Sequence, residues 1–443
     1  MKKYKLIAAS SFLVSALLLA GCTESFDWSQ GVKSTDLVFQ TFMPTEGAKG
    51  TTVTIQGNNF GTDPAQVKVW VNDVSQEILS VDQNFIKIKL ADGTGSGKVK
   101  VQVGETQYVY PDTFTYAFVT KVSTVAGNGT GGTLDGDALK SQLIWPISFA
   151  WDSKENCPVF LQDNGSTDNI RRLKDGKLET LCAVGGMLAN ARSIAFSVTG
   201  DTLFIGADGG NTAVAMVTRK GGFNDLQEYI PYSKFPVGNI NGIAVNPADG
   251  SVFTYHWPKY IYRYDATAGN VEEIVSREEL AALEVGIWGD NTVIDDGTYG
   301  GLAFSPDGKT LYHNAKNRYQ GILKADYDIA THRCSNLMRF AGSGCWGNDD
   351  GQGTAATIDQ PGEIKIGPDG NLYVVSGPGH TVRMVTPEGY VSTIAGKGWE
   401  AGYQDGVATD ARFRNPEGLI VAPNGDIYVG DCNNFRIRLI HKE

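Results

Sequence analysis

The sequence predicts an all-β protein in which a small β-sandwich is followed by a six-bladed β-propeller. Glycine occurs 54 times in 443 residues, well above its average share of about 7%, so tight turns are numerous. Short runs of alternating apolar and polar residues lie between these turns, as in β-strands. A pattern of strands and turns then recurs through the C-terminal part of the chain, which is typical of repeat architectures.

The overall composition narrows the classes of function. The formal net charge is -11 and the hydrophobic share is 41%, which fits a globular protein. A nucleic-acid-binding surface needs clustered Lys and Arg, so we expect no nucleic-acid partner. The same negative charge gives no general attraction to anionic lipids.

The first 21 residues have the pattern of a signal peptide, with three lysines before an apolar run too short for a membrane span. The run ends in Leu19-Ala20-Gly21-Cys22, which resembles the lipobox of bacterial lipoproteins. The resemblance implies removal of residues 1–21 and a lipid anchor on Cys22. Cys22 is followed by Thr23 and not by Asp, and in the family that it resembles this favours anchoring in the outer membrane. Whether the protein faces the cell surface or the periplasm is left open. The alternative is an ordinary signal peptide.

Residues 22–36 are polar and are expected to form a tether. Residues 37–117 are expected to form the sandwich, because alternating segments at 67–71, 85–90 and 99–103 are separated by turn residues. The segments at 44–50 and 53–61 resemble the IPT/TIG family of Ig-like domains. The resemblance implies a spacer or interaction module in which Phe60 closes one end of the sandwich.

Residues 118–443 contain the repeat. A strand that ends in Ala-Gly, an Asp-Gly turn and a residue pair ending in Pro recur at 122–146, 340–361 and 391–416. Two further strands joined by a Gly turn follow each copy. This order resembles the NHL-repeat family of propellers, and the copy ending at 431–438 matches it best. Innermost strands begin near residues 147, 193, 242, 301, 363 and 418, which predicts six blades.

The two ends of the repeat region are expected to pair. The last copy lacks a closing strand, while 121–127 at the start provides a spare one. Pairing of these segments closes the ring and leaves no open sheet edge there.

One face of the propeller is predicted to bind the ligand. Connections between blades lie on the same face as the turns between second and third strands, and here they are long, which often marks function. Exposed aromatic rings on them would suit stacking on sugar rings, although several of these rings are expected to pack against blades. The aromatic candidates are Trp257, Trp288, Trp346, Trp399 and Tyr403.

Polar residues around the channel are further candidates. They lie at the ends of second strands or at the mouths of inner strands, where they would bind a polar ligand or a structural cation, and no other cofactor is expected. A turn cap or an inter-blade hydrogen bond is the alternative role for each. These candidates are His256, Asp163, Asp431, Arg192, Glu363 and Glu417.

No motif identifies a catalytic residue. The sequences GxSxG and HExxH are absent. NHL-type relatives include zinc-dependent lyases, but His256, His313 and His380 occupy different positions along their strands. No zinc site is therefore predicted, and no carboxylate pair of the glycosidase type stands out.

The combination of lipobox, IPT/TIG domain and NHL-type propeller resembles surface lipoproteins of polysaccharide-utilisation loci. The resemblance implies a non-catalytic protein that binds a glycan or oligosaccharide for capture or utilisation, alongside other outer-membrane glycan-uptake proteins. Two alternatives stay open. One is a propeller enzyme, a hydrolase or lyase acting on a carbohydrate or lactone, and the other is a protein-interaction scaffold.

The lipid anchor has a direct test. Cys22→Ser removes the thiol that would be acylated, so we expect the variant to leave the membrane fraction. Fractionation of cells and washing of membranes at high salt measures this. A variant that still sediments with salt-washed membranes contradicts the anchor.

Overall fold

The computed structural model describes residues 36–165, 168–236, 238–256, 260–284, 301–315 and 320–443. The chain divides into two compact units at Tyr116 and Ala117. Each unit has its own core, so each is described by itself.

The N-terminal unit is a β-sandwich of two sheets. One sheet has the order β1 (Val38–Met43), β3 (Thr52–Asn58), β7 (Phe85–Lys89) and β6 (Glu77–Val81). The other has the order β2 (Glu46–Gly47), β9 (Thr106–Tyr116), β8 (Gly97–Val103), β4 (Val67–Val71) and β5 (Val74–Ser75). Their alternate residues share one apolar core.

Phe60 belongs to this core and is almost fully buried. Its ring lies against Gly57, where an added Cβ would be 2.3 Å from the ring. A larger residue at position 57 would collide with the Phe60 ring, so this position requires glycine.

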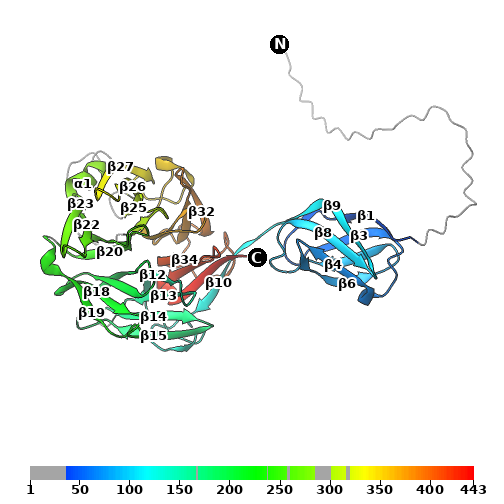
Figure 1. Ribbon diagram of the computed structural model, residues 1–443, viewed down its shortest axis with the longest axis horizontal. Helices are drawn as coiled ribbons and strands as arrows, with labels where there is room; N and C mark the ends of the chain where they lie inside the picture. The colour runs from blue at the N-terminus through cyan, green and yellow to red at the C-terminus, as the bar shows by residue number, and fades with distance from the viewer. Residues whose placement is uncertain (1–35, 166–167, 237, 257–259, 285–300, 316–319) are drawn as a thin grey trace, which may run out of the picture. The chain divides into compact units, whose positions relative to one another are not determined.

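The C-terminal unit is a propeller of six antiparallel sheets in the part of the chain described (Figure 1). The predicted all-β class, with a sandwich followed by a propeller, is confirmed. The innermost strands of blades one to six are β12 (Pro146–Asp152), β16 (Ala191–Phe196), β20 (Ile240–Val245), β24 (Leu302–Phe304), β29 (Pro361–Ile366) and β34 (Pro416–Val421).

The other strands follow outward in each blade. The second strands are β13 (Cys157–Gln162), β17 (Thr202–Ala207), β21 (Val252–His256), β25 (Thr310–Ala315), β30 (Leu372–Ser376) and β35 (Ile427–Asp431). The third strands are β14 (Asn169–Lys174), β18 (Thr212–Thr218), β22 (Tyr260–Asp265), β26 (Gly321–Asp328), β31 (Thr381–Val385) and β36 (Arg436–Lys442). The outer strands are β15 (Lys177–Ala183), β19 (Gln227–Pro231), β23 (Asn270–Val275), β27 (Arg333–Ala341), β32 (Tyr390–Gly396) and β10 (Thr120–Ala126).

One α-helix, α1 (Arg277–Glu284), is found in the described part of the propeller and follows β23. Ser276 caps its first turn: the Ser276 Oγ accepts from the Glu279 amide at 3.2 Å, and Glu279 accepts from the Ser276 amide at 2.8 Å. This reciprocal pair is a capping box, which fixes where the helix begins.

The ring closes through its two ends, as predicted. Strand β10, from the start of the unit, pairs antiparallel with β36, its last strand, with Thr120 opposite Lys442. The Val119 amide also donates to the Glu443 carbonyl at 2.9 Å. Blade six is therefore built from both ends of the unit, which removes an exposed strand edge.

The long connections that enter blades one, five and six are held in place by buried arginines. Each connection adds a short fifth strand to its blade: β11 (Gly136–Asp137), β28 (Gly351–Gln352) and β33 (Gly406–Val407). The Asp of each Asp-Gly turn then pairs with an arginine whose side chain is 0% exposed. The pairs and their distances are Arg171–Asp135 at 2.6 Å, Arg383–Asp350 at 2.8 Å and Arg438–Asp405 at 2.6 Å.

These arginine clamps predict a specific loss of stability. Asp350→Ala leaves the Arg383 guanidinium buried with only carbonyl partners, those of Thr357 and Asp349. A buried charge that loses its counter-ion is strongly destabilising, so we expect the free energy of unfolding to fall by about 2 kcal/mol or more.

Denaturant unfolding measures the change, with Asp92→Ala as the matched control. Asp92 is 53% exposed and pairs with Lys49 at 2.9 Å, and exposed pairs contribute at most about 1 kcal/mol. Equal effects of the two substitutions would contradict the clamp.

Candidate functional site

The inner strands surround a channel whose two ends differ. We call loop face the side on which connections between blades reach the inner strands, and turn face the side on which first strands turn into second strands. Near the loop face lies a polar cavity lined by residues from all six inner strands, among them Arg192, Asn241, Glu363 and Glu417. Its volume is about 20 Å³, which is room for about one water molecule. A sugar ring does not fit inside this cavity and could contact only its mouth.

The cavity is narrow because side chains bridge the inner strands. Ser148 Oγ accepts from the Ile194 amide of the next blade at 3.2 Å, and Ser193 Oγ accepts from the Ile243 amide at 3.2 Å. Each serine thus satisfies a backbone donor that would otherwise face the channel unpaired. These bridges link blades one, two and three.

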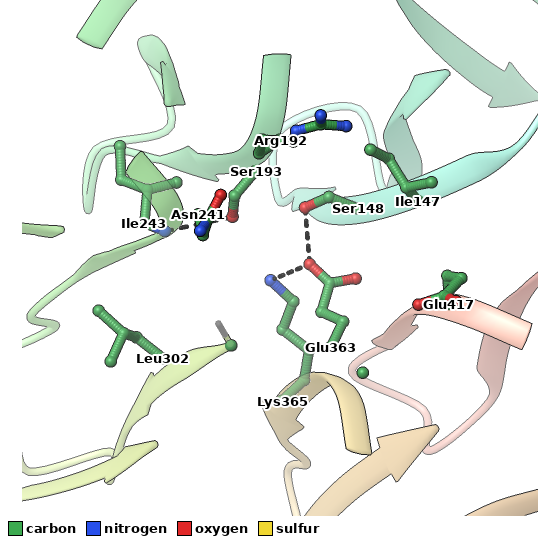
Figure 2. A pocket seen from close by; sticks show the side chains of 12 residues that line it. Ile147, Ser148, Arg192, Ser193, Asn241, Ile243, Leu302, Glu363, Lys365 and Glu417 are labelled. Carbon is green, nitrogen blue, oxygen red and sulfur yellow. Dashed lines mark hydrogen bonds and ion pairs between the residues drawn. The ribbon is translucent and has the colours of Figure 1, made fainter. Parts of the chain in front are cut away.

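Glu363 makes the corresponding bridge for blades five, six and one. Its carboxylate accepts from the Leu419 amide at 2.9 Å, from the Phe149 amide at 3.0 Å and from the Ser148 hydroxyl at 2.7 Å. The Lys365 ammonium pairs with the same carboxylate at 2.9 Å (Figure 2). Burial raises the pKa of Glu363, while Lys365 and the hydrogen-bond donors act in the opposite direction.

Arg192 and Asn241 lie on the next two blades. The Arg192 guanidinium is oriented by Asp163 at 3.1 Å and by Asp208 at 3.5 Å. Asn241 is 5% exposed, and its Oδ1 has no hydrogen-bond partner among the described residues. An unpaired buried acceptor in the lining of the cavity is a feature that a polar ligand or a water could satisfy.

Glu417 completes the polar lining on blade six. Its carboxylate accepts from the Asn415 side-chain amide at 2.8 Å. The structure therefore brings three predicted residues, Arg192, Glu363 and Glu417, to one cavity, and places Asp163 behind Arg192.

Two predicted tryptophans are exposed on loop-face connections. The Trp346 and Trp399 side chains are 65% and 57% exposed. Their loops are nevertheless anchored: the Trp399 amide donates to the Gly379 carbonyl at 3.2 Å, and Asn348 accepts from the Thr381 hydroxyl at 3.1 Å. An added Cβ at Gly379 would lie 2.6 Å from Asn348 Oδ1, so both loops pack closely on blade five.

Tyr403 is half-exposed but engaged within blade six. The Arg436 guanidinium lies 3.9 Å from the ring centroid, and the Tyr403 hydroxyl lies 3.0 Å from Thr124 Oγ1. Trp257 and Trp288 lie outside the described residues.

The structure does not bring His256 and Asp431 to the cavity. Both are 0% exposed. The ring nitrogens of His256 contact the Gly238 carbonyl at 3.1 Å and Thr254 Oγ1 at 2.9 Å. Asp431 pairs with Arg438 at 2.8 Å and accepts from the Arg414 amide at 2.7 Å. Both residues lie at the ends of second strands that are buried within their blades. Buried polar side chains need hydrogen-bond partners, and here the blades themselves supply them.

His313 and His380, the other two histidines considered as zinc ligands, also make local contacts. His313 Nδ1 lies 3.2 Å from the Gly301 carbonyl, and His380 Nδ1 accepts from the Asn415 amide at 3.2 Å. Burial lowers the pKa of His380, which favours the neutral ring that can accept this bond. Within the described ranges, no group of three or more His, Cys, Asp or Glu side chains is placed to hold a metal ion.

Sequence reasoning missed Ser148, Ser193 and Lys365 as channel residues. A signal was present: Ser148, Ser193 and Glu363 occupy the repeat position that is glycine at 242, 301 and 418.

In the described chain, no helix is long and apolar enough to cross a membrane.

Each unit contains a match to a known family. Residues 37–116 match the IPT/TIG domain family and residues 413–438 match the NHL repeat family. A curated relative is Protein SUPPRESSOR OF QUENCHING 1 of Arabidopsis thaliana, 33% identical over 32% of this chain. The match spans only 14% of that protein's length.

Two solved Bacteroides structures cover almost the whole chain, and both are described as auxiliary nutrient binding proteins. That of Bacteroides ovatus covers 92% of this chain and 98% of its own, with a TM-score of 0.73 and 24% identity. That of Bacteroides thetaiotaomicron covers the same shares, with a TM-score of 0.63 and 24% identity. At this identity the likeness shows the fold. The chain thus joins an IPT/TIG domain to a six-bladed propeller of the NHL-repeat type.

Proposed function

We propose that this protein binds a carbohydrate on the loop face of its propeller, without catalysis, as an outer-membrane lipoprotein engaged in glycan capture. The observation that carries the proposal is the pair of exposed tryptophans, Trp346 and Trp399, on anchored loops of the face that bears the polar cavity. The similar Bacteroides structures are described as nutrient-binding proteins, which supports a nutrient ligand.

The chemistry of this face fits a sugar. A pyranose ring presents apolar C–H groups on its faces and hydroxyls at its edge, so it needs aromatic rings and polar groups together. Trp346 and Trp399 offer the first. Arg192, Asn241 and Glu417 at the channel mouth offer donors and acceptors.

Anchoring makes the exposed rings suitable for binding. A ring on a mobile loop loses conformational entropy when it contacts a ligand, and that loss reduces affinity. The loops of Trp346 and Trp399 are fixed beforehand by Asn348, Gly379 and the Arg383–Asp350 clamp. Less ordering is then needed on binding.

The alternative of a propeller enzyme has less support in the site. Glu363 is a buried carboxylate whose pKa is raised, which makes it the candidate for a general acid or base. Its oxygens already accept hydrogen bonds from Ser148, Phe149 and Leu419. These bonds link three blades, so the carboxylate has a structural role. In the ligand screen below, product formation would indicate a hydrolase or lyase, and binding to no glycan would favour a scaffold.

A glycan screen followed by tryptophan substitution tests the proposal. We expect the chain carrying Cys22→Ser to bind at least one member of a glycan panel and to leave it intact. Trp346→Ala and Trp399→Ala should each weaken that affinity about fivefold or more, since an aromatic stacking contact contributes about 1 kcal/mol beyond area burial. Thermal stability should hardly change, because both rings are exposed.

Trp70→Ala is the matched control, because Trp70 lies in the N-terminal unit beneath the Lys100 ammonium. Calorimetric titration measures all three variants. Product formation from the glycan would establish the enzyme instead. Unchanged affinity in both loop variants, or a loss as large in the control, would contradict the loop-face site.

A further inference from the structure

The channel opens at the turn face into a second cavity with a different character. This apolar funnel has a volume of about 490 Å³, within the usual range of about 300–1,000 Å³ for small-molecule pockets. Each blade contributes an apolar residue from the same repeat position to the lining of the funnel. These residues are Trp151, Phe196, Val245, Phe304, Ile366 and Val421.

The funnel is wide because four of the six blades have alanine one position earlier in the repeat. Ala150, Ala195, Ala244 and Ala303 line it in blades one to four. At the same repeat position, blade five has Lys365 and blade six has Ile420. Because the side chain of alanine is only a methyl group, these four positions leave space around the Lys365 side chain.

Lys365 is the one charged side chain among the described residues that line the funnel. It also lines the polar cavity on the other side, so it stands where the two spaces meet. Its ammonium has three donors, and the bond to Glu363 at 2.9 Å uses one of them (Figure 2). Glu363 in turn is stabilised by donors other than Lys365, namely Ser148, Phe149 and Leu419.

We propose that the funnel binds an aliphatic carboxylate, with the hydrocarbon chain against the apolar wall and the carboxylate on the Lys365 ammonium. Burying the chain removes apolar surface from water, and the ammonium gives the head group a charge-assisted hydrogen bond. A monoanion suits the site better than a phosphate dianion, because Glu363 already lies beside the ammonium. This site is separate from the carbohydrate site and does not depend on it.

Decanoate and 1-decanol test both parts of the proposal. We expect calorimetry to show saturable binding of decanoate to the Cys22→Ser chain, at least tenfold tighter than 1-decanol. Lys365→Met should remove this preference and leave 1-decanol binding in place. Ala195→Trp should fill the funnel and weaken both ligands at least tenfold.

Ala330→Trp is the matched control, because exposed Ala330 lies in the turn between β26 and β27, away from the funnel lining. It should bind both ligands as the parent chain does. Melting curves show whether each variant folds, and Val245→Trp replaces Ala195→Trp if that variant does not. The proposal is overturned if the parent chain shows no saturable decanoate binding, if Lys365→Met keeps the preference, or if a folded funnel-filling variant binds normally.

Discussion

The carboxylate of Glu363 is the interaction on which the channel depends. It comes from blade five and accepts backbone amides from blade six and blade one, so it joins three inner strands across the region where the ring closes. Such a buried charge is costly unless it is fully hydrogen-bonded, and here four donors surround it. The same bonds narrow the channel, so that a polar cavity faces one side and an apolar funnel the other.

Buried ion pairs hold the long connections of the loop face to blades one, five and six. Arg171, Arg383 and Arg438 are buried in third strands and each pairs with an Asp from the incoming connection. These connections are therefore part of the blades, even though they are long and rich in glycine. The exposed tryptophans are therefore held by connections that are tied to the blades. For this reason we propose that the tryptophans contact the glycan and that the Asp-Gly turns support the structure.

The fold was predictable because its signals are local and repeated. Strand alternation, Asp-Gly turns and the spare strand at 121–127 indicated the sandwich, the six blades and the closure. The site was less predictable. His256 and Asp431 have the polarity of ligand contacts, but their burial depends on partners such as Thr254 and Arg438, which pattern alone does not reveal. Lys365 was missed because its access to the funnel depends on the alanines that stand at the same repeat position in four other blades.

Hydrogen exchange in the presence of a bound glycan tests the loop-face assignment most directly. Mass spectrometry of the Cys22→Ser chain, with and without a glycan from the panel, measures which amides the ligand protects. We predict protection in the connections that contain Trp346 and Trp399 and at the start of the inner strands near Arg192. Protection confined to the turn face or to residues 37–116 would contradict the account.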